Sequence, residues 1–245
     1  MDMVYLDFAK AFDLVPKKRL LEKLRAHGFT GALLSWIEDW LTGRKQRVVL
    51  NGCPSTWQAV TSGVPQGSIL GPILFNIFIN DLDENIDVSL LLKFADDTKM
   101  GQVIESEEDQ VHLQSCLNRI WDWTEKWGMR FNVSKCHVMH LGRTNPRFVY
   151  TLNGVDLEPT EEEKDLGVLI TSNLKMGRQC ERAAHTASAA LAQILRAFSY
   201  RNKSTLPKLF QTYVRPHLEY GMLYRPGHHG RLVMWKSWRR CRREW

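Results

Sequence analysis

Apolar and polar positions along the chain predict two acid-tipped strands and a hairpin. MVYLDF, residues 3–8, reads as a short buried strand that ends in an acid. LLLKFADD, residues 90–97, reads as a second such strand, which turns back through TKMGQVI. The stretch from Arg47 to Ser62 alternates on both sides of an Asn-Gly-Cys-Pro turn, which is typical of a hairpin. Further short strands are expected around 129–141, 147–152 and 164–170.

Helical spacing dominates elsewhere. Leucines in KKRLLEKLRAHG predict a helix ended by Gly28, and a second helix is expected from Thr30 to Gly43. After the breaker-rich loop GVPQGS, residues 69–85 predict a mostly buried helix. The remaining helices are expected at 107–127, with Trp121, Trp123 and Trp127 as packing residues, and at 177–199 and 204–220. This order of elements predicts an α+β body with a helical part beginning near residue 175.

Composition narrows the class of protein. With 245 residues, 44% hydrophobic and 24% charged, the chain has the composition of a globular protein. Its 5 cysteines include no C-x-x-C pair, which argues against a disulfide framework. Cys136, His137 and His140 have no second ligand pair at zinc-finger spacing and are expected to belong to a strand. The longest apolar run is too short to cross a bilayer, so we expect an intracellular protein of the cytoplasm or nucleus without a membrane partner.

The positive charge is concentrated at one end of the chain. The formal net charge is +6, and residues 225–245 alone account for it, with tryptophans interleaved among the basic residues. Such a segment is expected to bind RNA or DNA without sequence preference. Alternatively, residues 227–245 are a disordered tail from an aberrant reading frame. The arginines that would contact phosphate are Arg239, Arg240, Arg242 and Arg243.

Acids at the ends of the two predicted strands raise the question of a metal site. An Asp-Asp pair at a hairpin tip can simply cap the turn. Asp7, however, also ends a strand, and Asp13 follows it. If the strands are neighbours, Asp7, Asp96 and Asp97 converge and repel one another unless a cation neutralises them. Hard divalent ions prefer oxygen ligands, so Mg²⁺ is the expected ion. Charge balance requires one cation, and a second would suit phosphoryl transfer.

Four ordered motifs resemble one enzyme family. YLDFAKAFD, GVPQGSILGP, FADD and KDLGVLI are similar to motifs in the reverse transcriptases of LINE-type (non-LTR) retrotransposons, above all the chicken-repeat and jockey-like group. The likeness extends from about residue 3 to about residue 226. It implies an α+β palm, an antiparallel sheet backed by helices, with remaining fingers elements over 1–174. KDLGVLI resembles the strand pair that grips the primer in this family. Thumb-like helices would follow over 175–226, and the basic tail would occupy 227–245.

The resemblance also implies a chemistry. Asp7 and Asp96 would ligate two Mg²⁺ ions, for which Mn²⁺ can substitute, and Asp97 would be a supporting acid and further ligand. A primer 3′-hydroxyl would attack a deoxynucleoside triphosphate. The partners would be an RNA template and a DNA primer.

The remaining site residues come from the same motifs and, for Lys135, from the stretch GMRFNVSKC. Phe12 would pack under the incoming sugar, with ordinary core packing as the alternative. Gln66 would touch template or nucleotide, although GVPQGS could be a plain turn. Lys135 would protonate the departing pyrophosphate, or be a surface lysine without a role. The full set implied for nucleotide or template contacts is Phe12, Gln66, Gly67, Phe94 and Ala95.

Parts of the family pattern have no counterpart here. The fingers strands that precede the first acidic motif, and their triphosphate-binding cation, have no place before Asp7. The sequence after Pro226 also leaves the pattern. We therefore expect a truncated RNA-directed DNA polymerase that is inactive or weak alone. The alternative is a catalytically silent remnant that only binds nucleic acid.

Overall fold

The described residues form two compact units. The computed structural model describes residues 1–198, 202 and 204–220. The first unit comprises Met1–His140 and Thr144–Pro159, and the second comprises Leu141–Arg143 and the described residues from Thr160 onward. The change from body to helical part was expected near residue 175. The second unit begins earlier, because the hairpin that follows Thr160 belongs to the same unit as the helices. The assignment of palm, thumb and tail by role stays a prediction.

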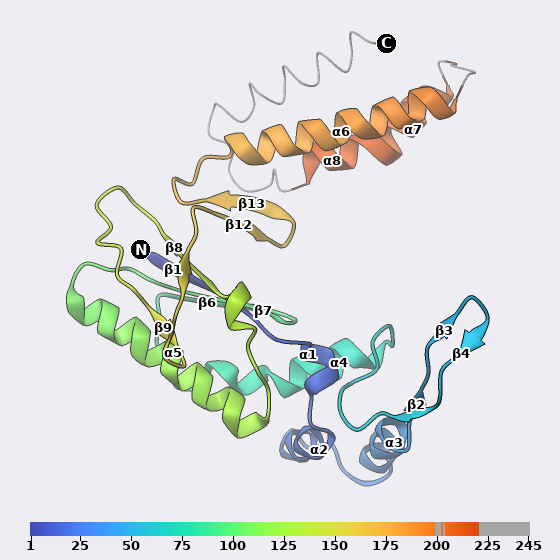
Figure 1. The fold of residues 1–245 in the computed structure, drawn as a ribbon, viewed down its shortest axis with the longest axis vertical. Coiled ribbons are helices and arrows are strands. Elements are labelled where there is room, and N and C mark those ends of the chain that lie inside the picture. Colours follow the sequence, from blue (N-terminus) through green and yellow to red (C-terminus); the bar gives the residue numbers. More distant parts are fainter. Residues whose placement is uncertain (199–201, 203, 221–245) are drawn as a thin grey trace. The chain divides into compact units, whose positions relative to one another are not determined.

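A five-stranded sheet forms the base of the first unit, in the order β11–β8–β1–β7–β6 (Figure 1). Neighbouring strands are antiparallel, except that β11 pairs with β8 in parallel. Burial alternates along the central strand β1, so that one face of the sheet lies against the core. The strands are β1 (Asp2–Asp7), β6 (Leu90–Phe94), β7 (Asp97–Gln102), β8 (His137–His140) and β11 (Glu158–Pro159).

Helices back this sheet, which confirms the predicted α+β class (Figure 1). Leucines of α2 and α5 belong to one apolar core with the inward residues of β1. The short strand expected around 129–141 is reduced to β8, because Val133–Lys135 form the 3₁₀ turn η2. The helices are α1 (Ala11–Leu14), α2 (Lys17–Ala26), α3 (Gly31–Leu41), α4 (Leu70–Phe78) and α5 (Glu107–Trp127).

The helix expected over 69–85 is shorter and less buried than predicted. α4 ends at Phe78, and the 3₁₀ turn η1 follows over Asn80–Asp83. Phe75 and Phe78 are buried, but Ile69 and Ile73 are exposed. The apolar composition of this stretch therefore reflects one packed face and one open face, not burial all round.

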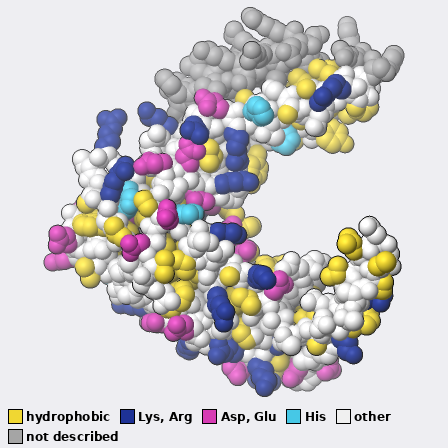
Figure 2. Space-filling view, in the orientation of Figure 1, with side chains coloured by type: hydrophobic (Ala, Val, Ile, Leu, Met, Phe, Trp, Pro, Cys, Tyr) yellow, Lys and Arg dark blue, Asp and Glu magenta, His cyan; other side chains and the backbone are white. Residues whose placement is uncertain are grey.

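The predicted hairpin between Arg47 and Ser62 is confirmed. It carries exposed apolar side chains, including Val48, Leu50 and Trp57, and Figure 2 shows hydrophobic side chains gathered at its tip. A smaller hairpin pairs β9 with β10. The short strands are β2 (Lys45–Gln46), β3 (Val49–Leu50), β4 (Cys53–Pro54), β5 (Gln58–Ala59), β9 (Thr151–Leu152) and β10 (Val155–Asp156).

The second unit is a hairpin followed by helices. The stretch 164–170, expected as a short strand from its pattern and as a strand pair from the family resemblance, forms a strand pair: Leu166 and Gly167 have positive φ values of 45° and 84° and turn the chain between β12 and β13. α6 buries Leu191 and Ile194 in a small separate core. The elements are β12 (Glu162–Asp165), β13 (Val168–Thr171), α6 (Gly177–Ala197), α7 (Thr205–Leu209), the π-helical turn η3 (Phe210–Val214) and α8 (Arg215–Glu219).

The last helix expected, over 204–220, is present without a gap as α7, η3 and α8, but its middle turn is π-helical. Pro216 lies in the first turn of α8 and has no N–H to donate, so the regular hydrogen-bond ladder cannot run through it. Arg239, Arg240, Arg242 and Arg243 lie outside the described residues. Within the described ranges, no helix combines the length and apolar character that a membrane crossing requires.

Candidate active site

Asp7 ends the central strand of the sheet. In the antiparallel register β1 pairs Asp7 with Asp97 of β7 and Leu6 with Thr98. Leu6 and Thr98 are buried, so the alternation of side chains directs Asp7 and Asp97 away from that core face. Carboxylates directly opposite each other on neighbouring strands repel, and a nearby cation would remove this cost.

Asp96 occupies the tight turn between β6 and β7. Phe94 pairs with Asp97, so Ala95 and Asp96 alone form the turn. Ala95 has a φ of 53°, in the left-handed region that a residue with a Cβ rarely adopts. Strained backbone of this kind concentrates at functional sites because the surrounding structure must hold it. Here the paired strands hold it, and they present Asp96 at the sheet edge.

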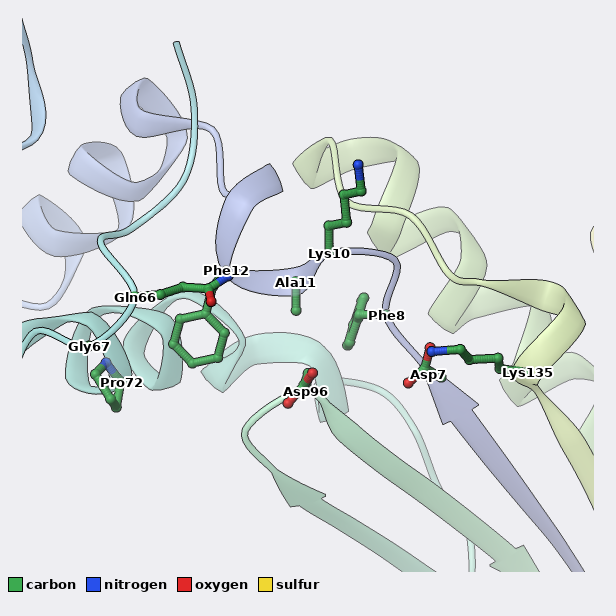
Figure 3. Close-up of a pocket in the computed structure, with 10 residues that line it drawn as sticks. All are labelled: Asp7, Phe8, Lys10, Ala11, Phe12, Gln66, Gly67, Pro72, Asp96 and Lys135. Atoms are coloured by element: carbon green, nitrogen blue, oxygen red, sulfur yellow. The ribbon is translucent and has the colours of Figure 1, made fainter. Parts of the chain in front are cut away.

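A pocket of about 460 Å³ collects most of the residues that the sequence singled out. In Figure 3, Asp96 lies between the Phe12–Gln66 side of the pocket and the Asp7–Lys135 side. The lining residues are Asp7, Phe8, Lys10, Ala11, Phe12, Gln66, Gly67, Pro72, Asp96 and Lys135. Residues far apart in the sequence are therefore brought together, as expected. Their individual roles stay predictions.

Three expected site residues are absent from this lining: Phe94, Ala95 and Asp97. Phe94 is 64% exposed, and Asp97 is exposed on β7. In the described part of the chain, no three His, Cys, Asp or Glu side chains are grouped closely enough to hold a metal ion. Of the three acids expected to converge, only Asp7 and Asp96 line the pocket. Asp97 lies beside Asp7 in the sheet.

This donor set fits a hard divalent cation. Both pocket acids are half-buried and supply only oxygen ligands, which Mg²⁺ and Mn²⁺ prefer. The pocket is open enough for water and phosphate oxygens to complete the coordination, as Mg²⁺ usually requires.

The segment 130–136 supports Asp7 from the other side. Asn132 N donates to Asp7 O at 2.8 Å, and Asp7 N donates to Cys136 Sγ at 3.5 Å. Burial is the main cause that raises the pKa of Cys136 to about 11, so the thiol stays protonated and donates to Asn132 O. Lys135 Nζ lies 3.5 Å from Asp7 Oδ2. The charged tip of β1 is therefore held by backbone, thiol and ammonium together.

Phe12 and the GVPQGS loop form the opposite side of the pocket. Phe12 stacks on Phe75 with ring centroids 4.7 Å apart, which fixes the ring. Gln66 Nε2 donates to Asp13 Oδ1 at 3.0 Å. Gly63, at a φ of 88°, lies so close that a Cβ would be 2.7 Å from Phe12 O. Only glycine permits this approach, so the loop and the Phe12 turn are locked together.

Sequence reasoning did not single out four lining residues: Phe8, Lys10, Ala11 and Pro72. Lys10 has a φ of 48° and caps α1 at the pocket. The signal that could have found it is its position between Asp7 and Asp13 in YLDFAKAFD. Phe8 and Ala11 are buried, and their place at the pocket follows from the chain leaving β1.

Comparison with known proteins identifies the family. The family model described as reverse transcriptase (RNA-dependent DNA polymerase) matches residues 3–175. The chain therefore belongs to the reverse transcriptase family. The resemblance drawn from the four motifs is confirmed.

The relatives that the chain matches include RNA-directed DNA polymerases from mobile elements. The chain is 30% identical over 233 residues to the RNA-directed DNA polymerase from mobile element jockey of Drosophila funebris, covering 89% of this chain and 25% of the relative. It is 28% identical over 229 residues to the probable RNA-directed DNA polymerase from transposon X-element of Drosophila melanogaster, again covering 89% and 25%. The chain thus spans a quarter of the length of these relatives.

A solved structure supports the fold. Apo telomerase from Candida tropicalis is similar with a TM-score of 0.50 at 12% identity, over 79% of this chain and 36% of that chain. At this identity the likeness concerns the fold alone.

Proposed function

We propose that this chain is the catalytic part of an RNA-directed DNA polymerase of a non-LTR retrotransposon. The observation that carries the proposal is that Asp7 and Asp96, from two separate motifs, line one pocket with Gln66 and Lys135. RNA would be the template, and deoxynucleoside triphosphates would extend a DNA primer. Family membership supports the reaction class, and the pocket supports the place.

The carboxylates of Asp7 and Asp96 would hold two divalent cations. Such ions, when bound, activate the attacking hydroxyl and stabilise the leaving oxygens of a phosphoryl transfer. Asp97 would add negative charge beside Asp7 and strengthen the attraction for cations. Without a cation, the facing carboxylates of Asp7 and Asp97 would repel each other.

The other lining residues would position the nucleotide. The Phe12 ring, fixed by Phe75, would form the floor beneath the sugar and leave no room for a 2′-hydroxyl. Gly67 has a φ of 78°, and a Cβ added there would meet no other atom within 4 Å, so its backbone leaves space for a close ligand. Lys135 would supply a proton to the departing pyrophosphate.

Mn²⁺ binding to the full chain, followed by the electron paramagnetic resonance of the free ion, tests the metal site. Asp7→Asn and Asp96→Asn should each weaken binding by roughly tenfold or more, since each removes a charged ligand. Asp97→Asn should weaken it less. Asp39→Asn, an exposed acid on α3, is the matched control and should change nothing. Equal affinities of the wild type and the Asp7 and Asp96 variants would remove the proposal's basis.

Primer extension on poly(rA)/oligo(dT) then tests the substrate class in the same variants. Extension by the wild-type chain is expected to be weak, and Asp7→Asn or Asp96→Asn should abolish it. A chain that binds Mn²⁺ and nucleic acid but extends no primer would instead be a binding remnant. The concentration of positive charge in residues 225–245 is what favours that second candidate.

A further inference from the structure

One short segment contacts the backbone and the carboxylate of Asp7. The backbone carbonyl of Asp7 accepts from Asn132 N at 2.8 Å, and its N–H donates to Cys136 Sγ at 3.5 Å. Its carboxylate lies 3.5 Å from Lys135 Nζ. Two residues further along, Ala9 N donates to Arg130 O at 2.8 Å. The segment 130–136 therefore fixes both the position of Asp7 and its electrostatic environment.

The backbone of Lys135 is fixed, whereas its side chain is not. In η2, Lys135 N donates to Asn132 O at 2.9 Å and Cys136 N donates to Val133 O at 3.1 Å. The Lys135 side chain is 66% exposed, and that of Asp7 is 30% exposed. Figure 3 shows the ammonium group directed at the Asp7 carboxylate. An ammonium on a four-carbon stem at this exposure can leave its partner without moving the backbone.

The position of Asp7 explains why it needs a positive charge when no metal is bound. Asp97 lies directly opposite Asp7 in the β1–β7 register, and like charges so placed destabilise the sheet. Lys135 offsets this repulsion. A divalent cation bound to Asp7 would use the same carboxylate and would repel the ammonium beside it. Lys135 and a bound metal ion therefore cannot both occupy their most favourable positions beside the Asp7 carboxylate.

We propose that Lys135 is the resident counter-ion of Asp7 in the metal-free protein and that a divalent cation displaces it. This inference rests on the proposed function only in that Asp7 binds a metal ion. Displacement frees the ammonium within the same pocket, so binding of the ion and release of the lysine are one event. The lysine then becomes available to phosphate oxygens only after the metal ion is in place.

Mn²⁺ titration of Lys135→Met in the full chain tests the competition. Exposed ion pairs contribute modestly, so the variant should bind Mn²⁺ about two- to fivefold more tightly than the wild type at low salt. Lys135→Arg keeps the positive charge and should therefore bind Mn²⁺ with the affinity of the wild type. The gain should shrink at 1 M salt, where charges are screened within about 3 Å.

The matched control is Lys18→Met, which removes an exposed lysine of the same unit that does not line the pocket. It should leave the affinity within about 1.5-fold of the wild type, because a remote exposed charge is screened. In an Asp7→Asn background, Lys135→Met should have no effect beyond that of Lys18→Met.

The outcomes of these titrations separate the two proposals. If Asp7→Asn weakens Mn²⁺ binding but Lys135→Met binds no more tightly than Lys18→Met, the counter-ion role is overturned and the metal site stands. If Asp7→Asn has no effect on Mn²⁺ binding, the metal site of the proposed function fails, and displacement at Asp7 fails with it.

Discussion

Lys23 and Asp81 lie in the interior of the first unit, whereas Lys135 and Asp7 lie at its pocket. The Lys23 side chain is 5% exposed and that of Asp81 is 23% exposed, against 66% and 30% for the pocket pair. Rings of Phe78, Trp123 and Trp127 surround the Lys23 ammonium, with the nearest centroid, of Trp127, 3.8 Å away. The Lys135 side chain is instead largely open to solvent.

The difference in burial between the two ion pairs decides whether each pair can exchange partners. Lys23 also donates to Phe78 O, and Trp123 Nε1 donates to Asp81 Oδ1 at 3.0 Å, so each member of the buried pair has a further fixed contact. Removing either charge leaves the other without compensation in a low-dielectric site. The pocket pair can exchange partners because water replaces a lost contact at little cost. The first pair holds elements together, and the second is available for ligand exchange.

Of these substitutions, Asp81→Ala should lower the free energy of unfolding the most. It leaves the Lys23 ammonium buried without its partner, and the free energy of unfolding should fall by about 3 kcal/mol. Urea unfolding followed by tryptophan fluorescence measures this. Asp83→Ala is the matched control, because Asp83 lies in the same turn but is 48% exposed in its ion pair with Lys93. That control should cost less than about 1 kcal/mol. Equal losses would mean that burial does not distinguish the two aspartates.

The pH dependence of stability gives the next largest effect. Burial, more than any other cause, lowers the pKa of Lys23 from 10.5 to about 8. Between these values the unfolded chain holds a proton that the folded chain has released, so raising the pH favours folding. From pH 7 to pH 10 the free energy of unfolding of the wild type, relative to Lys23→Met, should rise by about 2 kcal/mol. A flat or falling difference would show that the ammonium stays charged within its aromatic surroundings.

Lys135→Met should have the smallest effect on stability. Its ion pair is exposed and rests on a single contact at 3.5 Å, so the free energy of unfolding without metal should change by less than about 0.5 kcal/mol. The same urea series, with Lys18→Met beside it, measures this. A loss as large as that of Asp81→Ala would make Lys135 a structural residue and erase the contrast between the pairs.

Local sequence patterns predicted the elements that carry the site. Apolar stretches that end in acids predicted β1 and the β6–β7 hairpin, and leucine spacing predicted α2. They failed where the local signal is ambiguous: residues 133–135 fit an extended pattern but form a 3₁₀ turn. For residues 164–170 the local pattern predicted only a strand, because Leu166 is not a typical residue for a positive φ, and it was the family resemblance that indicated a strand pair.

The site divides in the same way. The motifs sufficed to bring Asp7, Asp96, Gln66 and Lys135 to one pocket, since each motif lies next to a predicted strand or loop. They could not show that Asp97 does not line the pocket, because this depends on the register of β1 with β7. Nor could they reveal the Lys23–Asp81 pair, which exists only once α2, η1 and α5 have packed together. Trp123 and Trp127 are confirmed as packing residues, because their rings contact the Lys23 ammonium of this pair.

The central position of β1 means that it must wait for its partner strands during protein synthesis. Its two neighbours, β7 and β8, are made long after it, and the contact between Asp7 and Cys136 spans 129 residues. At a ribosomal rate of about 5–20 residues per second, Asp7 waits roughly 6–26 s for the segment that will hold it. Until β7 is made, both edges of β1 are open to foreign strands, and the edge that pairs with β8 stays open longer. Asp7 is thus synthesised well before the segment that encloses it.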